Sequence, residues 1–101
     1  DRLRKRWPGS RCDVIGHIGD GNLHFFVHPG HVTGDHLHEQ SDEDVYAPLG
    51  AIGGSVSAEH GIGREKRTHL GISRSADEIA LMRVLKQSMD PKGILNPGKV
   101  L

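Results

Sequence analysis

The chain has 101 residues, which is enough for one small domain or part of one, and hydrophobic residues make up 35% of it. Lys and Arg total 13, as do Asp and Glu, so the net charge favours neither a nucleic acid nor an anionic membrane as a partner. No apolar run approaches the roughly 20 residues of a transmembrane helix, and the single cysteine, Cys12, cannot form a disulfide within the chain.

The first predicted elements are a short charged helix and a β-hairpin. Residues 1–6 are typical of the end of a helix, and apolar runs predict strands over 11–17 and 22–28. The dipeptide Asp20-Gly21 between the strands is a strong signal for a two-residue turn, in which both central residues take positive φ. The sequence therefore predicts a tight hairpin.

This turn decides which hairpin residues face each other. A two-residue turn at Asp20-Gly21 pairs His17 with His24, with their Cβ atoms about 4.5–5.5 Å apart on one face. Two neutral imidazoles at that distance can share a metal ion. A single histidine more often has a structural role; the pairing strengthens the case for a metal site, and the residues alone leave both roles open. Asp20 is expected to serve the turn.

Two helices are predicted in the second half of the chain. Ser41 and the acidic residues after it predict a helix start, and Pro48 is expected to kink that helix or move its start. Ser75 and Glu78 form a capping-box pattern, which predicts the clearest helix, ending at Asp90. We therefore expect an α+β fold in which a β-hairpin, with at most one further short strand, packs against two or three helices.

A second chemical motif lies between these helices. A short β-prone run leads into Glu59-His60, and glycines close this corner. We expect the corner to fold back against His17 and His24, so that Glu59 becomes the third ligand of a two-histidine, one-carboxylate site. His60 could act as a general base beside the metal or form only a turn hydrogen bond, and the residues alone leave both roles open.

Three ordered motifs carry a family resemblance: GHIGDGNLH at 16–24, GGSVSAEHGIG at 53–63 and LNPGK at 95–99. Together they resemble the C-terminal part of FAD-linked oxidases of the vanillyl-alcohol oxidase type. The most similar branch is that of the D-2-hydroxy-acid dehydrogenases, which includes D-lactate dehydrogenase, the glycolate oxidase FAD subunit and D-2-hydroxyglutarate dehydrogenase. The resemblance implies that residues 1–101 are the C-terminal fragment of a ferredoxin-like substrate (cap) domain. It also implies that the FAD-binding domain belongs to a longer parent protein and is absent from this chain.

The resemblance implies roles for residues of the first two motifs. His17, His24 and Glu59 match ligands of a divalent metal, for which zinc is expected. His60 matches the base that removes the α-hydroxyl proton of the substrate. The resemblance therefore agrees with the site expected from the residues themselves.

Further contacts are implied around this site. Asn96 and Lys99 match a loop near the flavin and are the expected cofactor contacts. Asn22 and Lys66 are expected to contact the substrate together with the two histidines. Lys66 also belongs to a basic run, 64–67, that could steer an anionic substrate.

The implied reaction is the oxidation of a D-2-hydroxy acid, such as D-lactate, glycolate or D-2-hydroxyglutarate, to the 2-oxo acid, with hydride transfer to FAD. The fragment alone is expected to be inactive, because it holds no hydride acceptor. The expected partners are a small anionic 2-hydroxy acid, the FAD-binding domain of the parent protein and an electron acceptor. The expected location is the cytoplasm, or the mitochondrion of a eukaryote.

Two alternatives stay open. One is a flavoenzyme of the same fold that acts on a phenol or an ether lipid, and the other is a metal-binding or interaction module without catalysis. Within the favoured reading, Phe26 departs from the hydroxyglutarate branch, which carries a polar substrate contact at that position. This departure argues against a long diacid substrate.

Overall fold

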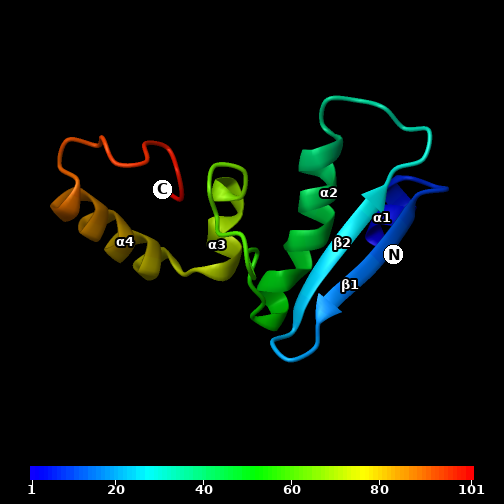
Figure 1. Ribbon diagram of the computed structural model, residues 1–101, viewed down its shortest axis with the longest axis horizontal. Helices are drawn as coiled ribbons and strands as arrows, with labels where there is room; N and C mark the ends of the chain where they lie inside the picture. The colour runs from blue at the N-terminus through cyan, green and yellow to red at the C-terminus, as the bar shows by residue number, and fades with distance from the viewer. The chain divides into compact units, whose positions relative to one another are not determined.

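The computed structural model describes residues 1–101, which divide into two compact units, Asp1–Pro48 and Leu49–Leu101. In chain order the elements are α1 (Arg2–Arg6), β1 (Arg11–His17), β2 (Asn22–His28), α2 (Leu37–Tyr46), η1 (Ala47–Ile52), η2 (Arg67–His69), α3 (Leu70–Ser73) and α4 (Ala76–Met89) (Figure 1). The expected α+β content is confirmed. None of the helices has the length and hydrophobicity that crossing a membrane requires.

The hairpin occupies the strand ranges that the sequence predicts, but the predicted turn is wrong. β1 and β2 pair antiparallel with His17 opposite Asn22, so four residues, 18–21, form the connecting loop. Within this loop only Gly21 has a positive φ, of 70°. The Asp20 carboxylate accepts a hydrogen bond of 3.0 Å from the backbone N–H of Asn22. Because this side-chain bond fixes the turn with Asp20 outside the left-handed region, the two-residue type I′ turn does not form.

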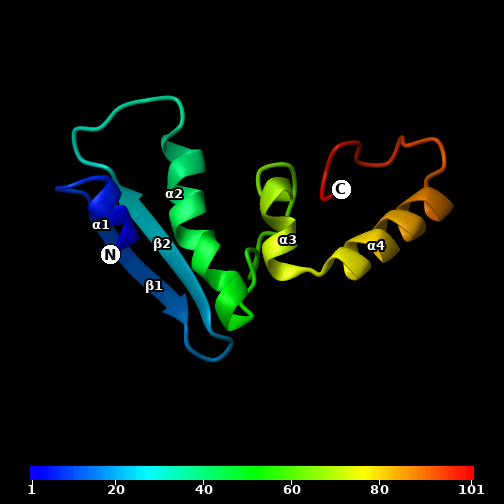
Figure 2. The ribbon, with the colours of Figure 1, turned by 180° about the vertical axis from the view of Figure 1, so that it is seen from behind.

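A buried ion pair joins the helices of the first unit. The guanidinium of Arg6 in α1 binds both carboxylate oxygens of Asp44 in α2, with Nη2 3.1 Å from Oδ1. Asp44 is only 7% exposed, and hydrogen bonding from Arg6 lowers the pKa of its carboxyl group. Leu3 and Trp7 supply the buried apolar side chains of this unit. The strands pass in front of α1 in Figure 1 and behind it in Figure 2, so α1 lies over one face of the hairpin.

α2 begins earlier than predicted and ends where proline requires. Ser41 does not cap the helix, because its hydroxyl donates to the backbone oxygen of His38, 2.8 Å away, from within the helix. Proline lacks the N–H that an α-helix needs, and Pro48 accordingly lies in the 3-10 segment η1 that follows α2. Gly53, with φ of 66°, then ends the helical segment.

α4 of the second unit confirms the predicted capping box. The backbone N–H of Ser75 donates to Glu78 Oε2 over 2.8 Å, and the backbone N–H of Glu78 donates to Ser75 Oγ over 3.2 Å. The hydrogen bond from the Ser75 backbone lowers the pKa of Glu78. The helix ends before Asp90, as the sequence predicts.

The possible further strand is not formed, because the sheet contains β1 and β2 only. The β-prone run is held by a serine instead: Val56 N–H donates to Ser73 Oγ over 2.8 Å, and Ser73 Oγ lies 3.4 Å from the backbone oxygen of Gly54. Val56 is 2% exposed and is the most deeply buried apolar residue of the second unit. A side-chain bond to this short run replaces the strand partner that a ladder would need. The ferredoxin-like arrangement of the whole domain stays a prediction.

Candidate metal centre

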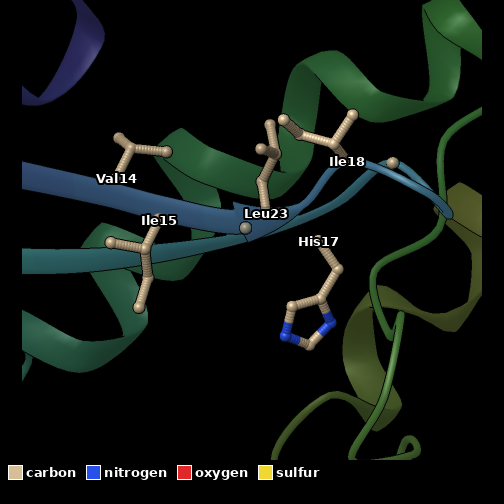
Figure 3. Close-up of a pocket in the computed structure, with 7 residues that line it drawn as sticks. Val14, Ile15, His17, Ile18 and Leu23 are labelled. Atoms are coloured by element: carbon tan, nitrogen blue, oxygen red, sulfur yellow. The ribbon is translucent and has the colours of Figure 1, made fainter.

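The hairpin places the two histidines of the first motif on one face. Side chains alternate between the faces of a strand, and directly paired residues share a face. Figure 3 shows Ile15 and His17 on one side of the hairpin and Val14 and Leu23 on the other. Since His24 pairs with Ile15, it lies on the same face as His17.

The predicted direct pairing of the histidines is wrong, although their proximity holds. The four-residue loop pairs His17 with Asn22 and His24 with Ile15, so the two histidines are diagonal neighbours. A register shift of two residues keeps every side chain on its face, whereas a shift of one would not. The two ring centroids are 5.3 Å apart with planes tilted by 60°.

This pair fits two positions of a divalent metal site. Imidazole nitrogens bind zinc at about 2.0–2.1 Å, a distance that two tilted rings at this separation can meet around one ion. The side-chain nitrogen of Asn22 lies 3.4 Å from Nδ1 of His17. Asn22 is 6% exposed, and this contact restricts the orientation of the His17 ring.

The Asn22 contact is a feature that the sequence analysis missed. The expected two-residue turn placed Asn22 opposite Gly19, whereas the observed register places it opposite His17. The signal was present in the sequence, since Asp20 two residues before Asn22 is the pattern of a side-chain-closed turn. Asp20 serves the turn, as expected.

The second motif lies in the second unit. Glu59 and His60 are adjacent, exposed residues in a bend, followed by Gly61 with φ of 77°. Lys66 lies half-buried further along, and its backbone N–H bonds to the oxygen of Ile62 over 3.1 Å. The metal-ligand role of Glu59, the base role of His60 and the substrate contact of Lys66 stay predictions.

The third motif forms a tight turn near the C-terminal end of the chain. The backbone N–H of Lys99 bonds to the oxygen of Asn96 over 3.3 Å, and Asn96 has a positive φ of 46°. Both residues are exposed. Their contact with a flavin stays a prediction, and the turn itself suits the turn-forming residues Asn-Pro-Gly.

A buried carboxylate, that of Asp90, precedes this turn; the sequence indicated Asp90 only as the end of a helix, and its burial was not predicted. Asp90 is 5% exposed and accepts hydrogen bonds from Lys86 Nζ and from the backbone N–H groups of Ile94 and Leu95, the last two over 3.0 and 2.9 Å. The hydrogen bond from Lys86 is the main cause that lowers the pKa of Asp90. The spacing of four residues between Lys86 and Asp90 was the available signal.

The family of the chain follows from a comparison with protein-family models. The family described as FAD linked oxidases, C-terminal domain, matches residues 2–100. The chain belongs to this family. The match confirms the resemblance of the three motifs and covers both units.

Three relatives of this FAD-linked oxidase domain have names that refer to D-2-hydroxyglutarate. The chain is 46% identical to a D-2-hydroxyglutarate dehydrogenase of Xanthomonas citri pv. viticola, covering 97% of the chain and 22% of that protein. It is 45% identical to the mitochondrial D-2-hydroxyglutarate dehydrogenase of Bos taurus, covering 98% and 18%. It is 41% identical to a D-2-hydroxyglutarate–pyruvate transhydrogenase of Saccharomyces cerevisiae, covering 93% and 19%. The chain thus spans about a fifth of the length of these curated relatives.

Proposed function

We propose that the parent protein is an FAD-dependent dehydrogenase that oxidises a D-2-hydroxy acid to the 2-oxo acid, with this chain supplying the metal ligands and the base. The family membership supports an FAD-linked oxidoreductase. The names of the relatives support a 2-hydroxy acid as substrate. The observation that carries the proposal is the pair of tilted imidazoles, His17 and His24, 5.3 Å apart on one face of the hairpin.

The proposed metal ligands are His17, His24 and Glu59. Two imidazoles and one carboxylate suit zinc and other first-row divalent ions, and they leave positions for the substrate. A divalent cation bound there would supply positive charge beside the substrate's carboxylate and α-hydroxyl, which lowers the pKa of that hydroxyl. Asn22, through its contact at Nδ1, holds the ring of His17 in orientation.

The proposed base is His60. An unprotonated ring nitrogen of His60 takes the proton of the α-hydroxyl while the hydrogen on the α-carbon leaves with its electron pair. FAD bound in the parent protein would supply the acceptor for that hydride. The substrate thereby loses one proton and one hydride and becomes the 2-oxo acid. Asn96 and Lys99 are the proposed flavin contacts, and Lys66 is the proposed partner of the substrate's carboxylate.

The face that carries the histidines also suggests which acid is preferred. Ile15 pairs with His24 and is 60% exposed, and Phe26 lies two residues beyond His24 on the same face and is 50% exposed. Apolar groups here favour a hydroxy acid with a short apolar substituent over one with a second carboxylate, whose burial beside them would be costly. On this feature we expect D-lactate to be a better substrate than D-2-hydroxyglutarate. The names of the relatives favour D-2-hydroxyglutarate instead, and the rates of flavin bleaching by the two acids decide between them.

Anaerobic bleaching of the flavin in the purified parent protein tests the proposal. We expect D-lactate, glycolate or D-2-hydroxyglutarate to bleach it, and we expect metal chelation to abolish the reaction. His60→Gln should slow it by about 10²–10⁴-fold. His31→Gln, which alters an exposed loop histidine, is the matched control and should leave the rate unchanged.

The outcomes separate the proposal from its alternatives. Bleaching by a phenol or an ether-lipid precursor, and by none of the hydroxy acids, would favour a different reaction on the same scaffold. An inert flavin with all of these compounds would favour a metal-binding or interaction module. We place the parent protein in the bacterial cytoplasm or in the mitochondrion, and the name of the bovine relative supports the second for a eukaryotic source.

A further inference from the structure

The turn Asn96–Lys99 is fixed at its upstream end by α4. Asp90 at the end of α4 accepts the backbone N–H groups of Ile94 and Leu95. Lys86 Nζ donates both to Asp90 and to the backbone oxygen of Leu95. Leu95, the residue just before the turn, is therefore bound twice. Its N–H donates to the carboxylate of Asp90, and its carbonyl group accepts from the ammonium of Lys86.

The downstream end of the turn is fixed to the segment that follows His60. The backbone N–H of Val100 donates to the oxygen of Gly63 over 2.7 Å. The guanidinium of Arg67 in η2 donates from Nη1 to the oxygen of Gly98 over 3.2 Å. Residues 31 positions apart are thus joined by one side chain within the second unit.

The backbone of the turn explains why it needs these anchors. Asn96 and Val100 both have positive φ, of 46° and 70°. The left-handed region is strained for a β-branched residue such as Val100 and persists only where the surroundings enforce it. A free tail would relax from this shape, so the hydrogen bonds to Gly63 and Arg67 keep the turn as it is.

We infer that Arg67 is a positioning residue for the flavin reaction, holding the turn Asn96–Lys99 against the segment that carries Glu59 and His60. The inference rests on the proposed function, in which the turn contacts the flavin and His60 is the base. Arg67 acts through the carbonyl group of Gly98, to which its guanidinium donates. It joins the flavin-contacting turn to residues 63–67, the segment that follows the proposed base.

This role differs from the steering of an anionic substrate, which the basic run 64–67 also suggests. Steering depends on charge alone, weakens with salt and changes KM. Positioning depends on a donor at the right place and changes the order of the turn and the rate of the step that it serves. Arg67→Met removes both charge and donor, whereas Arg67→Lys keeps the charge and one donor group.

The experiment uses the parent holoenzyme with Arg67→Met, Arg67→Lys and the control Arg83→Met, which removes an exposed guanidinium of α4. Hydrogen–deuterium exchange is measured on peptides covering residues 96–101, with FAD release on dilution and steady-state kinetics. We expect Arg67→Met to speed exchange of the Lys99 and Val100 amides by about tenfold, as for loss of one charge-assisted hydrogen bond. FAD release should rise and kcat should fall, with KM for the hydroxy acid unchanged.

The remaining variants sharpen this result. Arg67→Lys should restore most of the protection and of the FAD retention, and Arg83→Met should match the wild type in all three measurements. A salt-dependent rise in KM without faster exchange would overturn positioning in favour of steering. Faster exchange with wild-type FAD release and kcat would also overturn it, because the turn would then not serve the flavin.

The test is independent of the proposed function. If the wild-type holoenzyme oxidises none of the hydroxy acids, the proposed reaction fails. Exchange and FAD release still judge Arg67 in that case, since neither depends on turnover. An Arg67→Met protein that exchanges and retains FAD like the wild type overturns the inference whatever the substrate is.

Discussion

Each unit contains one buried aspartate bound by a basic side chain, and the two aspartates are held differently. Asp44 of the first unit depends on Arg6, which is 38 positions away and in another helix. Asp90 of the second unit depends on Lys86, four positions away, and on two backbone N–H groups that follow it. The first aspartate joins separate elements and the second ends a helix, so similar chemistry serves long-range packing in one unit and local order in the other.

The largest effect is expected from breaking the long-range pair. Asp44→Asn should lower the midpoint of thermal unfolding by roughly 10 °C, because it removes the buried charge of α2 that Arg2 and Arg6 of α1 both approach. Asp90→Asn should lower it by about half as much. Residues 91–99 are exposed, so water can replace the lost partners and the opening stays local. Circular dichroism of both variants during heating measures the difference.

Glu43→Gln is the matched control for the first unit. Glu43 lies beside Asp44 and 3.5 Å from the same Arg6, but its side chain is 64% exposed. Exposed ion pairs contribute little. An equal loss for Glu43→Gln and Asp44→Asn would show that the burial of Asp44 is not the cause.

Two glycines give a second, smaller contrast. One faces the neighbouring strand of the hairpin, and the other has open space beside it. A Cβ on Gly16 would collide with the backbone oxygen of Asn22 and lie 2.9 Å from Leu23 Cδ2, whereas a Cβ on Gly71 meets nothing within 4 Å. Gly16→Ala should cost about 1–3 kcal/mol by overpacking the hairpin beside His17. Gly71→Ala should stabilise by about 0.5–1 kcal/mol, as expected for a helix interior. Urea denaturation of both variants measures these changes, and a neutral Gly16→Ala would contradict the register.

The capping box tests the purely local signal of α4. Ser75→Ala removes the acceptor of the Glu78 backbone N–H and should cost about 1 kcal/mol. Ser88→Ala, at the other end of the helix, removes a hydroxyl bonded only to the backbone oxygen of Val84 and should cost less. Urea denaturation again provides the measurement, and an equal loss for both serines would contradict the capping role.

The smallest expected effect is on the pH dependence of stability, to which both aspartates contribute. Hydrogen bonds from Arg6 and Lys86 lower the pKa values of Asp44 and Asp90 in the folded protein. Their stabilisation is therefore complete above the unfolded pKa of about 3.9 and is lost as the pH falls below it, through the folded values. Thermal midpoints between about pH 5 and pH 2 should fall less steeply for Asp44→Asn and for Asp90→Asn than for the wild type. A slope unchanged by both substitutions would contradict the lowered pKa values.

Local signals account for what could be predicted of the fold. The strand ranges, the capping box at Ser75, the end of α4 at Asp90 and the break at Pro48 each follow from a few neighbouring residues. The start of α2 was misplaced because Ser41 has two options, capping a helix or bonding back within it, and its neighbours do not choose between them. The third strand failed for lack of a partner, which a local pattern cannot reveal.

The candidate site was predicted in its residues and only partly in its geometry. The motif around His17 and His24 placed two imidazoles together, and the structure keeps them 5.3 Å apart. Their diagonal arrangement follows from the bond between Asp20 and Asn22, which competes with the expected turn. The even register shift preserved the shared face, which is why a wrong turn still led to the right pair.

The sequence by itself determined the family and the ranges of the hairpin strands and of α4, and it supplied the residues that are proposed for the chemistry. These depend on motifs and on bonds between close neighbours, which the order of residues specifies directly. Only the tertiary structure decided that Asp44 binds the guanidinium groups of α1 and that Arg67 anchors the C-terminal turn. Those contacts join residues on separate elements or across a loop, where the free energy of packing, and no local preference, selects one partner among many.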